Sequence, residues 1–169
     1  PKAPLNARAA DWVQHLPLYN DTWLFNASLQ SRYGVTDDVT LTSLTSYIRA
    51  KQDAFPQQGG ANFENSVYAS TGDFKDFFQE LRLDNGARGK FRWTLGLNYS
   101  SDNVIEGHRA FFSQNSAGLT LGTSGDKSSL TQDTNNYAAF GAVEFDITSA
   151  FTLKGGLRYT ETDRKGNAC

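Results

Sequence analysis

The sequence predicts an all-β protein, an antiparallel up-and-down meander of about six long strands. Three observations predict this fold class: apolar and polar residues alternate with period two, the connections alternate between short and long, and aromatic residues recur eight positions apart. The 169 residues carry a formal net charge of −2, with 38% hydrophobic and 20% charged residues. This length suits one domain or part of a larger one.

The period-two alternation identifies the strands, because successive side chains of a strand point to opposite faces. In residues 91–99 every odd position is large and apolar, and every even position is polar or glycine. Five further segments show weaker or interrupted forms of this pattern: 23–32, 39–49, 77–84, 137–145 and 151–159. We therefore expect strands over residues 22–165, each with one apolar and one polar face, after a loop remnant at 1–21.

The predicted connections alternate strictly in length. Short turns rich in Gly, Asp, Asn and Ser are expected at 34–37, 86–89 and 148–150, and long loops at 53–73 and 103–134. In a meander, every second connection lies at the same end of the sheet. All short turns therefore lie at one end and all long loops at the other, an arrangement typical of transmembrane outer-membrane barrels.

Aromatic residues provide an independent observation, because four pairs lie eight positions apart. The pairs are Phe25 and Tyr33, Phe91 and Tyr99, Tyr137 and Phe145, and Phe151 and Tyr159. Eight residues span about 26 Å along a strand, or about 20 Å along the membrane normal at a tilt of about 40°, close to the roughly 25 Å apolar band of such barrels. The predicted lipid-facing residues are Phe91, Trp93, Tyr99, Tyr137, Phe145, Phe151 and Tyr159.

The opposite faces of the same strands are polar and charged. Such groups would cost several kcal/mol each in a dry core unless paired, but little beside a water-filled lumen. The predicted lumen-facing residues are Glu80, Arg82, Arg92, Glu144, Lys154 and Arg158. With the faces kept in phase, Lys154 is expected opposite Glu144 or Asp146, and Asp84 is expected to face Arg92.

Several stretches together resemble the barrel of a known family, the TonB-dependent outer-membrane receptors. They are residues 41–47, 78–83, 92–99 and 137–141, the last running into 153–160. The resemblance covers most of residues 22–165, and it is carried by the order and spacing of the stretches more than by any single motif. It implies that the chain is an open part of a transmembrane 22-stranded β-barrel that encloses a plug domain.

The resemblance also implies a function for the whole protein, which would lie in the outer membrane of a Gram-negative bacterium. It would contact outer-membrane lipid and take up a scarce nutrient, most often a ferric siderophore and sometimes cobalamin, haem or a glycan. Energy would come from the TonB complex, coupled through an N-terminal box. This chain shows no plug and no such box, and it has neither Met nor a final aromatic residue. We therefore expect a fragment whose barrel continues beyond Cys169.

One group of residues in the longer predicted loop is a candidate ligand site. An aromatic and cationic cluster there could contact an anionic chelate, although simple loop packing explains the same residues. The predicted ligand-binding residues are His108, Arg109, Phe111 and Phe112.

Other classes of function are less well supported by the sequence. An enzyme would need tuned carboxylates or a Ser-His-acid set, yet the two histidines, His15 and His108, lie in expected loops and no Gly-x-Ser-x-Gly motif occurs. We therefore expect no catalytic residue, metal or cofactor. The balanced charge argues against nucleic acid as a partner. The alternative left open is a soluble β-barrel or β-sandwich that binds a ligand.

Overall fold

The structure is a computed structural model that describes residues 6, 10–57, 59–60, 62–65, 67–86 and 89–169. Six antiparallel strands form one sheet in the order β1-β2-β3-β4-β5-β6, which confirms the predicted meander. The strands are β1 Tyr19–Gly34, β2 Thr40–Phe55, β3 Val67–Asp84, β4 Phe91–Phe111, β5 Gly125–Thr148 and β6 Phe151–Ala168. A short helix, α1, covers Ser116–Leu121 between β4 and β5.

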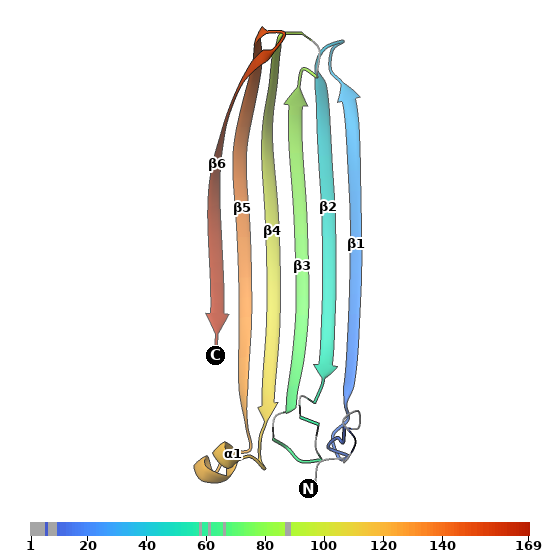
Figure 1. Cartoon of the computed structure of the whole chain (residues 1–169), viewed down its shortest axis with the longest axis vertical. Coiled ribbons are helices and arrows are strands. Elements are labelled where there is room, and N and C mark those ends of the chain that lie inside the picture. The colour runs from blue at the N-terminus through green and yellow to red at the C-terminus, as the bar shows by residue number, and fades with distance from the viewer. Residues whose placement is uncertain (1–5, 7–9, 58, 61, 66, 87–88) are drawn as a thin grey trace.

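The connections are sorted by length between the two ends of the sheet (Figure 1). Residues 35–39, 85–90 and 149–150 connect strands at one end, which we call the turn end. Within the second of these connections, residues 87 and 88 lie outside the described residues. Residues 56–66 and 112–124, the latter with α1, connect strands at the other end, which we call the loop end.

The strands extend further toward the loop end than the sequence predicted. Long loops were expected at 53–73 and 103–134, but the connections cover only 56–66 and 112–124. The backbone ladder continues through the predicted loops, where for example Glu106 pairs with Gly72 and Leu130. Polar residues occupy both faces there, so the period-two signal disappears. Ladder hydrogen bonds join backbone groups and need no apolar alternation.

A small apolar cluster closes the loop end of β2, β3 and β4. Val13, Phe55 and Val67 are buried, and Leu16, Ala69 and Phe111 pack against them. Val13 belongs to the segment expected as a loop remnant, and its backbone N–H donates to Gln57 Oε1 at 2.7 Å. Residues 13–16 therefore pack on the ends of the strands. Among the residues that the structure describes, no helix is long and apolar enough to span a membrane.

Candidate functional site

The strand register gathers the predicted lipid-facing residues on one face of the sheet, here called the apolar face. Phe91 lies directly opposite Phe145, and Tyr99 lies directly opposite Tyr137, with ring centroids 5.1 Å apart. Alternation along β4, β5 and β6 places Trp93, Phe151 and Tyr159 on this face as well. The leucines between the rings are open to the surroundings: Leu95, Leu97 and Leu157 are 56%, 61% and 82% exposed.

The aromatic residues of the apolar face form two lines that cross the strands obliquely. When directly paired residues are followed from strand to strand, Phe25 on β1 leads to Lys165 on β6. The aromatic residue of this line on β6 is Tyr159, which lies six residues from Lys165. The same path from Tyr33 leads to Leu157, six residues from Phe151. Six residues cover about 20 Å along a strand, and five strand spacings cover about 24 Å across the sheet. Both lines are therefore inclined by about 40° to the direction of the hydrogen bonds between strands.

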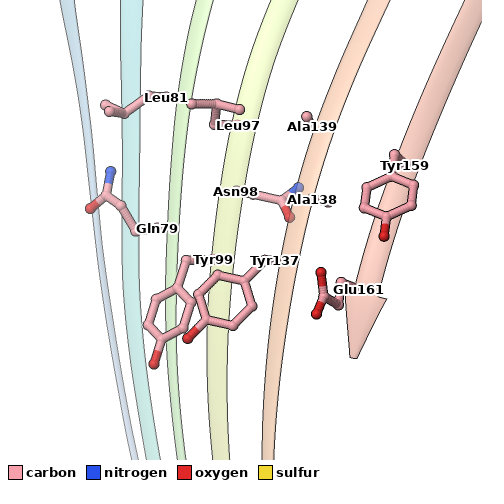
Figure 2. Close-up of a pocket in the computed structure, with 10 residues that line it drawn as sticks. All are labelled: Gln79, Leu81, Leu97, Asn98, Tyr99, Tyr137, Ala138, Ala139, Tyr159 and Glu161. Atoms are coloured by element: carbon pink, nitrogen blue, oxygen red, sulfur yellow. The ribbon is translucent and has the colours of Figure 1, made fainter. Parts of the chain in front are cut away.

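A hollow of about 410 Å³ interrupts the apolar face over β3 to β6. Figure 2 shows Ala139 between Leu97 and Tyr159, with Tyr99 and Tyr137 nearby. The small side chain of Ala139 leaves space that a larger residue would fill. The other lining residues are Gln79, Leu81, Asn98, Ala138 and Glu161.

The other face, here called the polar face, carries the six predicted lumen-facing residues. Arg92 lies opposite Glu144, and Glu144 lies opposite Lys154 on the next strand. Arg92 donates to Glu144 Oε2 from Nη2 at 3.2 Å and to Asp146 Oδ2 from Nη1 at 2.6 Å, while Lys154 Nζ lies 2.9 Å from Glu144 Oε1. Arg82 Nη1 lies 3.7 Å from Glu80 Oε1. On β3 to β6, four cations and four carboxylates therefore balance along this wall near the turn end: Arg82, Arg92, Lys154 and Arg158 with Glu80, Asp84, Glu144 and Asp146.

One charge contact predicted for this wall is wrong. Asp84 pairs with Thr94 in the ladder and accepts a hydrogen bond from the Gly86 backbone N–H at 3.0 Å, so it does not face Arg92. The positive φ of Gly86, 65°, bends the chain there. Asp84 therefore stabilises the turn, and Arg92 binds the two carboxylates of β5 instead.

Phe140 is an aromatic residue on the polar face. Its ring covers Gly96, where an added Cβ would lie 2.2 Å from the ring. The Arg158 guanidinium lies over the Phe140 ring, 5.7 Å from its centroid. Arg158 also donates to Asn98 Oδ1 at 3.2 Å. A glycine, an aromatic ring and a cation thus join β4, β5 and β6.

The structure does not bring the four predicted ligand-binding residues together. His108 and Arg109 lie in β4, not in a loop, and as adjacent strand residues they point to opposite faces. His108 is on the polar face, where its Nε2 lies 3.9 Å from Glu106 Oε2. Phe111 packs edge-on against Phe55 with centroids 5.3 Å apart, and Phe112 follows the end of β4.

Sequence reasoning missed a polar cluster that joins three separate segments at the loop end. His15 Nε2 lies 2.8 Å from Glu64 Oε1, and the Ser113 hydroxyl donates to the other oxygen of Glu64. The hydrogen bond from Ser113, followed by that from His15, lowers the pKa of Glu64 below its usual 4.5. These residues are about 50 positions apart, and no local pattern connects them. Within the described part of the chain, no group of three or more His, Cys, Asp or Glu residues could hold a metal ion.

The comparisons with known proteins agree with this geometry. The sequence profile of the TonB dependent receptor-like β-barrel family matches residues 3–168. The chain belongs to this family. Members are transport receptors, so membership confirms the expectation that the chain is not an enzyme. No significant match was found among curated proteins.

A solved structure shares the fold of this barrel segment. The chain is similar to the ferric yersiniabactin uptake receptor FyuA from Yersinia pestis, with a TM-score of 0.75 and 14% sequence identity. The match covers 89% of this chain and 22% of the receptor, so the chain spans about a fifth of the length of that protein. The sheet is therefore an open part of a receptor barrel.

Proposed function

We propose that these residues form part of the barrel wall of an outer-membrane receptor that takes up a scarce nutrient. In this proposal the apolar face contacts lipid and the polar face borders a water-filled lumen. The main support for this proposal is the angle of the two aromatic lines, which are inclined by about 40° to the direction of the hydrogen bonds between strands. The strands of outer-membrane barrels are tilted by a similar angle, about 35–45°, from the membrane normal. Aromatic lines inclined by this angle would lie level with the two membrane interfaces.

The exposure of the side chains supports this assignment of the two faces. On the central strands β3 and β4, the Glu80 and Arg92 side chains of the polar face are 19% and 20% exposed, far less than Leu95 and Leu97 of the apolar face. Side chains crowd together on the inner side of a curved sheet and spread apart on its outer side. The polar wall is therefore the more crowded one, as expected for a lumen, while the exposed leucines suit contact with hydrocarbon.

The finer function that we infer is uptake of a ferric siderophore, powered by the TonB complex through a segment outside these residues. The similar structure is that of a ferric yersiniabactin uptake receptor, which supports this choice of cargo. On the polar face, His108 remains the candidate ligand contact of the four predicted residues. Arg109 lies on the opposite face, and Phe111 is occupied by packing against Phe55.

Localisation of the full-length protein tests the barrel proposal. When it is expressed in a Gram-negative host, we expect it in the outer-membrane fraction, with a gel mobility that changes on heating. Recovery as a water-soluble monomer would contradict the proposal and would favour the alternative of a soluble ligand-binding β-protein.

A matched pair of variants tests the ligand-facing wall. In the full-length receptor, His108→Ala should weaken binding of the ferric siderophore, whereas Arg109→Ala, one residue away on the opposite face, should not. Binding can be measured by titration of the purified receptor and by uptake of labelled iron. Equal effects of the two variants would show that the faces are assigned wrongly.

A further inference from the structure

We propose that Asp76 and Asp102 share one proton and act as a pH-sensitive switch in the contact between β3 and β4. While the proton is bound, a hydrogen bond between the two carboxyl groups joins the strands. Once the proton leaves, two negative charges repel each other across the same contact. The sharing of the proton follows from the arrangement of the sheet, whereas the position of the switch in a water-filled lumen rests on the proposed function.

The strand register places the two carboxyl groups side by side. Asp76 on β3 lies directly opposite Asp102 on β4. Both are on the polar face, because each lies an even number of residues from Glu80 or Arg92 on its own strand. Directly opposite residues of a sheet have Cβ atoms about 4.5–5.5 Å apart, and like charges in that position destabilise the pairing.

The surroundings of the two carboxyl groups contain no compensating cation. Neither Asp76 nor Asp102 forms an ion pair with any residue that the structure describes. The closest charged positions on this face are Glu80 and Glu106, each four residues away on the same strand, and Arg164, two strands from Asp102. The immediate neighbours on this face are uncharged: Ile48 of β2, Phe74 and Phe78 of β3, Ser100 and Val104 of β4, and Thr134 of β5.

The acids of β5 on the same face show what this pair lacks. Glu144 lies 3.2 Å from Arg92 and 2.9 Å from Lys154, and Asp146 lies 2.6 Å from the same arginine. Cations therefore balance those two carboxylates. The β3–β4 pair has mainly apolar side chains beside it instead, which disfavour the charged form of a carboxyl group. A shared proton removes one charge and replaces the repulsion with a hydrogen bond.

The titration of the pair has a definite direction. Both groups lie on the loop side of the aromatic line through Phe77 and Tyr99, outside the region proposed to cross the membrane. Burial, followed by the hydrogen bond with Asp102, raises the pKa of Asp76 from 3.8 to about 6. Because the folded value is the higher one, the stability that the proton contributes is complete below 3.8 and is lost as the pH rises to about 6.

Hydrogen exchange in the full-length receptor tests the switch. Exchange of the backbone amides of residues 72–80 and 98–106, corrected for the intrinsic effect of pH, is followed by mass spectrometry from about pH 4 to about pH 7. Protection in the unmodified receptor should fall by up to about a hundredfold over this range, since two pKa units correspond to two factors of ten. Asp102→Asn should raise protection at pH 7 and remove most of the pH dependence, because an amide does not repel Asp76.

Two further variants complete the experiment. Asp76→Asn removes the other member of the pair and should have the same effect as Asp102→Asn. The matched control is Glu106→Gln, which neutralises a carboxylate on the same face and strand, four residues from Asp102. This control should leave the pH dependence of the unmodified receptor unchanged.

Four results would contradict the proposal. Protection that does not change with pH in the unmodified receptor would exclude a shared proton, and so would an unchanged dependence in both Asn variants. Lower protection of both Asn variants at pH 7 would show that the carboxylates stabilise the contact in their charged form. Recovery of full protection at pH 7 on addition of Mg²⁺ would show that the pair holds a metal ion in place of a proton. Outer-membrane localisation is the same in every case, so failure of the switch is distinct from failure of the barrel proposal.

Discussion

The sheet has two regions with the same ladder but different side chains. Between the aromatic lines, one face is apolar and the other is polar, as in Leu95 and Arg92 of β4. Beyond the loop-side line, β4 continues from Tyr99 to Phe111 with polar residues on both faces. The strands pair without a break across the boundary. The difference between the regions therefore lies in their side chains and not in their backbone hydrogen bonding.

This comparison shows what the side-chain pattern encodes. In the proposed barrel, an exposed residue of the apolar face contributes to stability only where hydrocarbon, and not water, covers it. The region between the lines should be sensitive to a change of polarity on that face, and the region beyond it should be tolerant. Both regions should be sensitive to changes that disturb contacts between neighbouring strands.

The largest expected effect separates the two regions directly. Leu95→Arg places a cation in the middle of the apolar face and should cost the full-length barrel about 2–4 kcal/mol of folding free energy in a bilayer. Ile105→Arg makes the same kind of change on the same strand and face, at a residue 47% exposed but beyond the aromatic line, and should cost about 0–1 kcal/mol. Urea titration of the reconstituted receptor measures both values. Equal costs would show that the aromatic lines do not bound the membrane.

A smaller effect concerns a contact between strands within the first region. Gly96→Ala would drive a Cβ into the Phe140 ring and should destabilise the barrel by about 1–3 kcal/mol, the usual cost of overpacking. Gly155→Ala is the matched control on β6, because an added Cβ there meets nothing within 4 Å. It should change stability by less than about 1 kcal/mol. A Gly96→Ala barrel as stable as the unmodified one would exclude a structural role for the ring over this glycine.

The two regions also explain how much the sequence could predict. Between the lines, the alternation predicted six strands, the faces of Arg92 and Trp93, and a position for Lys154 opposite Glu144 or Asp146. The structure pairs Lys154 with Glu144. Beyond them, strand residues such as His108 and Arg109 were taken for a loop, because a strand with two polar faces has no distinctive period. The contact of Arg92 with Asp146 in place of Asp84 depends on side-chain reach across strands, which spacing alone does not determine.

The smallest expected effect is confined to the loop end and depends on pH. Glu64 has a lowered pKa, so the stability that it contributes is complete above its unfolded value of about 4.5 and is lost as the pH falls through the lower folded value. Glu64→Gln should therefore weaken the packing of residues 11–16 at pH 7 by about 1–2 kcal/mol. Below the folded pKa, the variant and the unmodified protein should behave alike.

Hydrogen exchange, corrected for the intrinsic effect of pH, measures this change at two backbone amides. The Gln114 N–H donates to the Glu64 carbonyl, and the Leu16 N–H donates to the Val13 carbonyl, so both report on the cluster around Glu64. Glu106→Gln alters a carboxylate whose side chain is 47% exposed and should leave both amides unchanged. If protection at pH 7 survives Glu64→Gln, the apolar contacts of Val13 and Leu16 and the hydrogen bond from the Val13 N–H to Gln57 hold the segment without Glu64. The loop end would then resemble the rest of the sheet, where backbone pairing and packing persist without a specific charge.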